Sequence, residues 1–187
     1  PARLKSPRHP LDPALRLRST PSPLMNAQPE ALQIRHAGPA DAPTLARMLK
    51  EFAAYERLDN HSTEGTLAAE LGDPAGSLKA IIAELDGEAV GFATYFQTYS
   101  TFAARRGLYL EDIYVGESHR NRGIATGILR FLARLAVERQ YGRVEFTVLL
   151  WNSIAIEFFE GLGAKPANAW TTYRLTGEWL QKLASSG

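Results

Sequence analysis

Residues 108–129 read LYLEDIYVGESHRNRGIATGIL and contain three kinds of sequence in succession. In the segment 106–115, apolar residues occupy both odd and even positions, so both faces of a strand would be apolar. This pattern predicts a buried, central β-strand. The next six residues are polar and predict a loop. From residue 122 onward, apolar side chains recur at helical spacing and predict a long helix with one face turned inward. The inward residues are expected to be Ile124, Ile128, Leu129, Leu132 and Leu135.

The start of this helix has the features of an anion-binding site. The first N–H groups of a helix lack partners within it, and the helix dipole adds partial positive charge there. Gly123 and Ala125 are small enough for a ligand to approach the backbone closely, and Arg120 and Arg122 add two charges. We therefore expect this loop to bind phosphate groups. The alternative is a basic loop before an ordinary helix.

The remaining segments predict a single α/β domain with a mixed sheet. Helical periodicity predicts the helices, and Asp86-Gly87 between two strand-like segments predicts a hairpin. In chain order we expect a strand at 32–38, helices at 40–57 and 62–71, strands at 79–85, 88–99 and 106–115, a helix at 122–142, a strand at 143–150, a helix at 151–164, a strand at 169–176 and a helix at 177–184.

The composition limits the classes of partner and site. The formal net charge is +1, which gives no reason to expect nucleic acid or a membrane surface as a partner. No apolar run reaches the ~18 to 20 residues of a membrane span. Cysteine is absent, which excludes disulfides and thiolate chemistry within this sequence and fits a cytoplasmic location. The four histidines are scattered, so we expect no metal site.

The first thirty residues differ from the rest in composition. Residues 1–30 are rich in proline, arginine and serine, and the prolines prevent a long helix or a paired strand. We expect this segment to be a disordered tail; the alternative is a basic arm that docks on a partner. The folded domain is expected to span residues 31–187.

Several segments resemble one family of enzymes. The loop RNRGIAT (120–126) resembles the pyrophosphate-binding motif of the GNAT superfamily of N-acetyltransferases, and the order of elements is similar to that fold. The segments AAYE (53–56), GFATYFQTY (91–99), LYLEDIYV (108–115) and WNSIAIEFF (151–159) are similar to its diamine (spermidine/spermine) acetyltransferase branch. The resemblance implies a mixed, mostly antiparallel sheet of about six to seven strands flanked by helices, acetyl-CoA as the cofactor and a homodimer.

The resemblance also implies which residues bind the cofactor. In this family the strand before the phosphate loop separates from its neighbour, and its backbone pairs with the pantetheine arm and supplies donors to the oxyanion. The phosphates bind backbone amides at the start of the following helix, and a later helix adds further contacts. By position the residues are Ile113, Tyr114, Val115, Arg120, Asn121, Arg122, Gly123, Ile124, Ala125, Thr126, Asn152 and Phe159. A plain helix cap is a compatible alternative for Asn152.

Glu111, Tyr55 and Glu56 are candidates for contact with the amine. Glu111 and Asp112 are adjacent on a strand, so we expect them on opposite sides of the sheet and not as a pair on one atom. Glu111 matches the family position that binds the amine and relays its proton, which makes it the expected general base. For both carboxylates the alternative is a structural ion pair with an arginine. Tyr55 and Glu56 match the substrate-binding pair of the family, with a solvated helix end as the alternative.

The polyamine-binding positions of the branch are altered in this chain. Ser100 stands where the branch has an acid, Phe102 stands where it has a tryptophan, and Arg105 and Arg106 add positive charge. A polycation would meet too little negative charge there. We therefore expect Ser100 and Phe102 to contact a smaller substrate, such as a short diamine, an amino acid or a related amine.

Phe159 stands where the family carries a tyrosine whose hydroxyl donates a proton to the leaving sulfur. General acid assistance is typically worth ~10²- to 10⁴-fold in rate, but a thiol with a pKa of about 8.5 can leave without it. Tyr173, which we include among the catalytic residues, Tyr114 and a bound water are the candidate substitutes.

The sequence thus predicts an N-acetyltransferase that moves the acetyl group of acetyl-CoA to a primary amine of a small molecule by direct attack on the thioester. One alternative is a non-catalytic acyl-CoA-binding module, which the loss of the tyrosine at Phe159 would suit and the retention of Glu111 argues against. Another alternative is a protein-directed acetyltransferase.

Overall fold

The computed structural model describes residues 32–186, so the expectation of a disordered tail at 1–30 lies outside the described residues. The chain divides into two compact units, with the boundary between Thr147 and Val148. The first unit contains the sheet and three helices, and the second contains two helices. Each unit is described by itself below.

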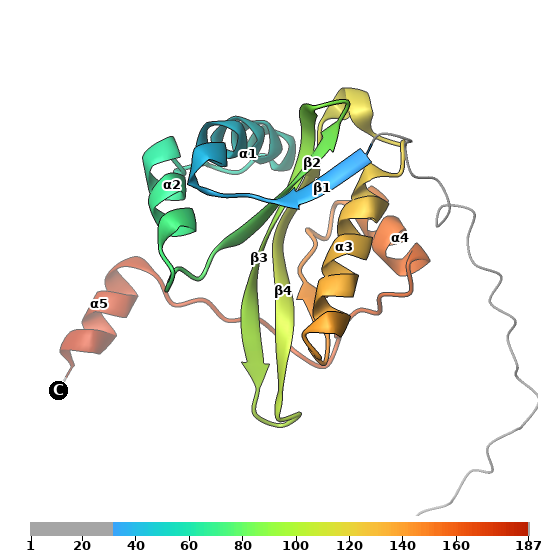
Figure 1. The fold of residues 1–187 in the computed structure, drawn as a ribbon. Helices are drawn as coiled ribbons and strands as arrows, with labels where there is room; N and C mark the ends of the chain where they lie inside the picture. Colours follow the sequence, from blue (N-terminus) through green and yellow to red (C-terminus); the bar gives the residue numbers. More distant parts are fainter. Residues whose placement is uncertain (1–31, 187) are drawn as a thin grey trace, which may run out of the picture. The chain divides into compact units, whose positions relative to one another are not determined.

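The first unit is built on a five-stranded sheet with the strand order β1-β2-β3-β4-β5 (Figure 1). Its neighbouring strands are antiparallel except for β4 and β5, which are parallel. The bounds are β1 (Leu32–His36), β2 (Lys79–Leu85), β3 (Glu88–Ser100), β4 (Arg105–Val115) and β5 (Val144–Phe146). The mixed, mostly antiparallel sheet is confirmed, whereas the expected six to seven strands are too many.

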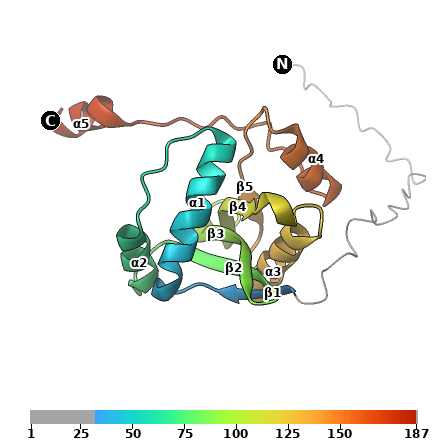
Figure 2. The same cartoon turned by 90° about the horizontal axis from the view of Figure 1, so that it is seen from above.

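Helices cover both faces of this sheet. The helices α1 (Ala42–Glu56) and α2 (Glu64–Gly72) lie on one face, and α3 (Ile124–Glu138) lies on the other (Figures 1 and 2). A parallel pair of strands requires a crossover connection, and α3 makes that connection between β4 and β5. The long strand β4 therefore ends at the loop that leads into α3.

The apolar stripe predicted on the long helix packs against the sheet. Ile124, Ile128 and Leu132 are almost completely buried, Leu135 is nearly so, and Leu129 is half-buried at the edge. On the opposite face, Leu45 and Met48 of α1 are buried against Phe92 of β3. Each face thus has its own apolar core, and β4 contributes residues to both.

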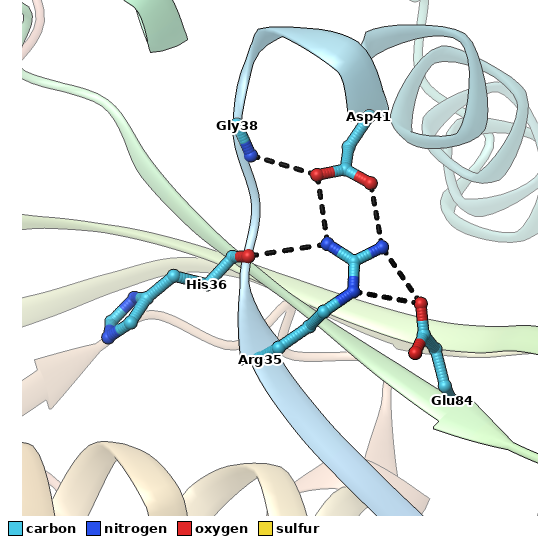
Figure 3. A network of polar contacts seen from close by, with 5 residues as sticks. All are labelled: Arg35, His36, Gly38, Asp41 and Glu84. Carbon is cyan, nitrogen blue, oxygen red and sulfur yellow. Dashed lines mark hydrogen bonds and ion pairs between the residues drawn. The ribbon is translucent and has the colours of Figure 1, made fainter. Parts of the chain in front are cut away.

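A charged cluster fixes the start of α1 to the edge of the sheet (Figure 3). Arg35 on β1 donates from Nη1 and Nη2 to the two carboxylate oxygens of Asp41, at 2.9 and 2.8 Å, and from Nε to Glu84 on β2 at 2.9 Å. Asp41 also accepts a hydrogen bond from the backbone N–H of Gly38. The hydrogen bonds from Arg35 lower the pKa of Asp41. Bidentate pairs of this kind are among the stronger polar contacts, and this one ties β1, β2 and α1 together.

The hairpin of β3 and β4 extends beyond the rest of the sheet (Figure 1). Strand β2 pairs with β3 only as far as Tyr95, whereas β3 and β4 continue to pair as far as Ser100 and Arg105. The end of the hairpin is therefore a two-stranded ribbon. The segment expected as a loop after residue 99 is only the turn at its tip.

The second unit contains α4 (Ser153–Gly161) and α5 (Gly177–Ser185). Both helices were predicted. The strand expected at 169–176 is wrong, because those residues have irregular backbone. The strand expected at 143–150 is correct only for residues 144–146. Threonine and aromatic residues favour strands, but an extended segment becomes a strand only where a neighbouring strand supplies hydrogen bonds.

Candidate active site

The candidate site lies where β4 and β5 separate. The two strands pair over Leu108–Leu110 and Val144–Phe146, and β5 then ends. Residues 112–115 of β4 continue to pair with β3 but have no partner in β5. Backbone N–H and C=O groups require hydrogen-bond partners, so this edge is suited to an extended ligand. This is the separation of strands that the resemblance implies.

A β-bulge coincides with the separation. Thr94 of β3 is opposite Asp112, but the next residue, Tyr95, is opposite Leu110. Glu111 is therefore the additional residue on β4. A bulge bends its strand and redirects nearby side chains, and bulges are frequent beside active sites. The exposed Glu111 lies between the buried Leu110 and the half-buried Asp112.

Asp112 is part of a pair of carboxylates. Burial raises the pKa of Asp112, and the hydroxyl of Thr94 partly offsets this by donating a hydrogen bond to Oδ2 at 2.5 Å. Burial, followed by the nearby charge of Asp112, raises the pKa of Glu56 in the last turn of α1. Within residues 32–186 Asp112 forms no ion pair. Two adjacent carboxylates in a partly buried place are suited to bind a cation.

The loop after β4 has the geometry expected of a phosphate site. The 3-10 helix η3 (Glu117–His119) leads to Asn121 and Gly123, whose φ angles are both positive, at 60° and 76°. Helix α3 then begins at Ile124, and no side chain caps its first N–H groups. The half-buried Ala125 and the buried Thr126 follow in its first turn. The exposed Arg122 lies directly before Gly123.

Arg120 links this loop to α1. Its Nε donates to the carbonyl oxygen of Val115 at 3.2 Å, and its guanidinium carbon lies 4.6 Å from the centre of the Tyr55 ring. Both side chains line a pocket of about 880 Å³ between α1, the start of β3 and the loop after β4. The structure thus joins one residue predicted to bind the amine and one predicted to bind phosphate.

The same pocket contains a second polar network. The Tyr114 hydroxyl donates to Oε2 of Glu51 at 3.2 Å, and Arg47 forms an ion pair with Oε1 of Glu51 at 2.9 Å. Burial, followed by Glu51, raises the pKa of Tyr114. A phenol with a raised pKa is a weaker acid, which makes Tyr114 a poor replacement for the missing tyrosine. Ile113 lies on the opposite face of the sheet and packs beside the α3 core.

Ser100 and Phe102 lie at the tip of the hairpin. The Ser100 hydroxyl accepts a hydrogen bond from the Ala103 N–H, and Phe102 is 99% exposed. Six residues of extended strand between Thr94 and Ser100 correspond to about 20 Å. Within one copy of the chain, these two side chains are therefore not near Asp112.

The remaining predicted residues lie in the second unit. Asn152 is buried, and its side chain accepts a hydrogen bond from the Ala155 N–H at 3.1 Å, so it caps α4 as the alternative interpretation allowed. Phe159 is buried and Phe158 is half-buried, with ring centres 5.3 Å apart. Tyr173 is 92% exposed in the irregular segment.

Three features of this site were not predicted from the sequence. The bulge at Glu111 leaves no mark in the pattern of apolar residues, because the strand reads as continuous. Thr94, which hydrogen-bonds to Asp112, is one threonine in a strand, where threonine is common. Glu51 is four residues after Arg47 on α1, a spacing typical of an ordinary surface pair.

No helix in residues 32–186 is both long and apolar enough to cross a membrane. No group of three or more histidine, aspartate or glutamate side chains in this range is arranged to hold a metal ion.

A match to a known family decides the identity of the domain. Residues 43–164 match the acetyltransferase (GNAT) family. The chain belongs to that family. The matched residues include nearly all of α1, the bulge in β4, the loop between β4 and α3, and α4, whereas Tyr173 lies outside the match.

Curated proteins and solved structures agree with this assignment. The chain is 32% identical over 166 residues to thialysine N-epsilon-acetyltransferase of Bos taurus, covering 82% of this chain and 97% of that protein. It is 28% identical over 198 residues to L-ornithine N5-acetyltransferase NATA1 of Arabidopsis thaliana, covering 81% and 87%. It is 33% identical over 165 residues to spermidine/spermine N(1)-acetyltransferase-like protein 1 of Homo sapiens, covering 81% of this chain and 24% of that protein.

Among solved structures, an integron cassette protein of V. cholerae superimposes with a TM-score of 0.73 and 26% identity, over 84% of this chain and all of that chain. The aminoglycoside N-acetyltransferase AAC(6')-Iy, solved in complex with CoA, superimposes with a TM-score of 0.64 and 22% identity, over 76% and 93%. The second likeness supports the fold alone.

Proposed function

We propose that this GNAT domain transfers the acetyl group of acetyl-CoA to the terminal primary amine of a small amino acid or a related amine. The observation that carries the proposal is the change in β4 at Glu111. At this residue the strand acquires a bulge, loses its β5 neighbour and presents carboxylates beside the phosphate loop. An extended thioester ligand and a cationic acceptor can therefore meet at one place.

The described residues fit acetyl-CoA, which supplies the activated acetyl group when bound. The uncapped first turn of α3 and the positive φ of Gly123 suit its phosphates. The backbone of Ile113, Tyr114 and Val115 lacks a β5 partner and suits its amide-containing arm. The proposed cofactor residues in the first unit are thus Ile113 to Val115 and Arg120 to Thr126, and those in the second are Asn152 and Phe159.

We propose that carboxylates of the first unit bind the amine and remove its proton. An amine is protonated near neutral pH and attacks only as the free base. Glu56 and Asp112 lie close enough for one charge to affect the other, so they are suited to hold the ammonium group. Glu111, exposed on the bulge, is proposed to accept the proton through water, so that it and Asp112 do not contact one atom together. Tyr55, one residue before Glu56, is proposed to form a wall of this site.

The proton donor to the leaving sulfur is proposed to be the Tyr173 hydroxyl. Phe159 has no hydroxyl, and the hydroxyl of Tyr114 already donates to Glu51. Tyr173 is well exposed, so its hydroxyl is accessible within the irregular segment. Its role therefore depends on how its segment is placed when both substrates are bound.

The relatives and the local charges together favour an amino acid over a long polyamine. The names of two relatives specify thialysine and ornithine, which are amino acids with a terminal amine. Arg105 and Arg106 lie near the tip of the hairpin with Ser100 and Phe102, so they bear on the substrate only where a second copy of the chain brings its hairpin tip to the site. There they would repel a polycation, and a carboxylate on the substrate would reduce this repulsion.

The test is release of free thiol from acetyl-CoA in the presence of a panel of amines. Thialysine, ornithine, lysine, a short diamine and spermidine are compared at equal concentration. We expect the amino acids to have the highest kcat/KM. Spermidine as the best substrate would refute the substrate class, and tight binding of acetyl-CoA with no thiol release for any amine would favour a non-catalytic module.

A homodimer and a cytoplasmic location are also proposed. Tyr99 and Phe102 on the hairpin are 62% and 99% exposed, and Trp170 and Trp179 in the second unit are 80% and 60% exposed. Contiguous apolar patches commonly mark contact surfaces, and we propose that Tyr99 and Phe102, close to each other on the hairpin, contribute to a contact between two copies of the chain. Light scattering during size-exclusion chromatography, and fractionation of cells that express the protein, test these two proposals.

A further inference from the structure

Two residues predicted for different subsites are in contact in the structure. Tyr55 was expected to bind the amine and Arg120 the phosphates, yet the guanidinium carbon of Arg120 lies 4.6 Å from the centre of the Tyr55 ring. We propose that Tyr55 is a positioning residue for Arg120 and that this contact couples cofactor binding to the amine subsite. The inference rests on the proposed function, because it assumes that Arg120 binds the cofactor phosphates.

The contacts of Arg120 fix the plane of its guanidinium group. The Nε–H is directed to the carbonyl oxygen of Val115 at 3.2 Å, and the Tyr55 ring covers the group. Both side chains are half-buried. A guanidinium group is planar and binds phosphate through two parallel N–H groups, so the direction of the plane determines whether they face the ligand. The ring therefore holds Arg120 in one orientation before the ligand arrives.

Acidic side chains of the same pocket make this restraint important. Glu51 and Glu117 line the pocket together with Arg120. Glu51 already accepts from Arg47 and from the Tyr114 hydroxyl, which limits its ability to attract a further cation. Glu117 has no such pair of donors among the described contacts. Without the Tyr55 ring, the arginine could turn toward these carboxylates, and a phosphate would have to displace them.

The position of Tyr55 connects the two subsites. Tyr55 and Glu56 are consecutive in the last turn of α1, and Glu56 is proposed above to hold the ammonium group of the substrate. An adjustment of this turn when the ammonium group binds would therefore move the ring that packs on Arg120. Coupling of this kind is reciprocal, so each ligand should increase the affinity for the other by the same factor.

The test compares two variants of one residue. Tyr55→Phe keeps the ring and removes the hydroxyl, whereas Tyr55→Leu removes the ring. The dissociation constant for coenzyme A is measured by calorimetry without any amine. We expect Tyr55→Leu to weaken binding about 3- to 30-fold, the range that a cation–π contact supports, and Tyr55→Phe to bind within about twofold of the parent. Unchanged affinity in a folded Tyr55→Leu variant would overturn the proposal.

A double-mutant cycle separates positioning from a general loss of structure. In the Arg120→Gln background, Tyr55→Leu should have little further effect on the affinity for coenzyme A, because the group that the ring positions is already absent. Equal effects of Tyr55→Leu in both backgrounds would overturn the proposal. Arg120→Lys gives an independent arm: it keeps the charge but not the planar fork, and it should still weaken binding, whereas undiminished affinity would count against the role of orientation.

The same data distinguish this inference from the proposed function. If the parent chain does not bind coenzyme A, the proposed function fails and the inference fails with it. If the parent binds coenzyme A and transfers acetyl groups while Tyr55→Leu binds equally well, only the inference fails. Thermal unfolding of each variant confirms that the compared proteins are folded.

Discussion

Both halves of β4 lie beside β3 on one side, but only the first half lies beside β5 on the other. Residues 108–110 pair with both β3 and β5, and Leu108 and Leu110 are buried in the α3 core. Residues 111–115 begin with the bulge, have no β5 partner and include a carboxylate whose pKa is raised by burial. In the proposed function, the first half of this continuous strand is structural and the second half carries the reactive groups.

This difference shows how a small domain can hold a reactive site without a long loop. The first half is fixed by hydrogen bonds on both sides, so the second half begins from a defined position. The end of β5 at Phe146 then leaves one edge of β4 without a neighbouring strand. Sites built on strands hold their geometry better than sites on loops. The following predictions test whether the two halves can be separated experimentally.

The largest expected effect follows from removing the base in the second half. Glu111→Gln keeps the size of the side chain but cannot accept a proton. We expect kcat/KM for the amine to fall by ~10²- to 10⁴-fold, the typical value of general base catalysis. The affinity for coenzyme A and the thermal unfolding midpoint should stay close to the parent values. Steady-state kinetics and calorimetry measure these quantities.

Glu145→Gln is the matched control for this change. Glu145 lies on β5 opposite Tyr109, beside the first half of β4, and forms an exposed ion pair with Arg143 at 2.7 Å. Such pairs contribute about 0–1 kcal/mol to stability, so activity should be retained. A similar loss of activity in both variants would contradict the division of β4 into two halves.

Two glycines of the β3–β4 hairpin provide a comparison of packing. A Cβ added at Gly91 would lie 2.7 Å from the carbonyl oxygen of Tyr114, in the second half of β4. A Cβ added at Gly107 would lie 2.8 Å from the Thr98 hydroxyl, in the ribbon before the first half. Gly91→Ala must displace backbone, whereas Gly107→Ala can be relieved by a side chain. We expect Gly91→Ala to cost about 1–3 kcal/mol of stability and Gly107→Ala less.

The two glycine variants should also differ in cofactor binding. Because the Tyr114 backbone belongs to the edge proposed for acetyl-CoA, Gly91→Ala should raise the dissociation constant for coenzyme A, and Gly107→Ala should not. Chemical unfolding gives the stabilities and calorimetry gives the affinities. Equal affinity in the two variants would show that the second half tolerates displacement and would weaken the proposed binding edge.

Much of the fold could be predicted from the sequence because its periodicity is strong. The inward residues of α3 and the hairpin at Asp86-Gly87 follow from local patterns that the tertiary structure does not override. The end of the sheet could not be predicted in the same way. Residues 169–176 have suitable strand composition, but strand formation depends on a partner that no local pattern specifies.

Single residues of the candidate site could be proposed from local sequence, whereas contacts between distant residues could not. The proposed phosphate loop has a local signature in Arg120, Gly123 and Ala125, and in the structure it precedes a helix whose first N–H groups no side chain caps. The contact of Tyr55 with Arg120 and the pairing of Glu56 with Asp112 join segments more than fifty residues apart. Such contacts arise from how α1 packs on the sheet, which spacing along the chain does not specify.

A moderate effect is expected from restoring a hydroxyl at Phe159. Phe159→Tyr adds a proton donor at the position where the family carries one. If the acid role is vacant, kcat should increase about tenfold or more, within the lower range of acid catalysis. Phe159 is buried, so the added hydroxyl also carries a cost if it finds no partner. Thiol release and thermal unfolding are both measured.

Tyr173→Phe is the companion to this change. If Tyr173 is the donor, its loss should lower kcat in the parent, and Phe159→Tyr should restore activity in the double variant. No gain from Phe159→Tyr, together with no loss from Tyr173→Phe, would indicate that the second half of β4 and its carboxylates are sufficient for the reaction.

The smallest effect is expected from neutralising Asp112. As the pH rises and Asp112 ionises, its charge should lower the stability of the protein but strengthen its binding of the amine. Because burial raises the pKa of Asp112, ionisation destabilises the folded protein. The loss of stability begins near the unfolded pKa of about 3.9 and is complete once the pH is above the raised pKa of the folded protein. Asp112→Asn should therefore be as stable as the parent or slightly more stable at pH 7 to 8, while its KM for the amine rises a few-fold.

At a pH low enough to protonate Asp112, the parent and Asp112→Asn should bind the amine with similar affinity. Asp86→Asn, at the exposed turn between β2 and β3, is the matched control and should change neither quantity. A fall in stability at pH 7 in Asp112→Asn, with the KM for the amine unchanged, would mean that the carboxylate holds the strand together. The second half of β4 would then be structural at Asp112, and the reactive region would be reduced to Glu111 and the backbone beyond it.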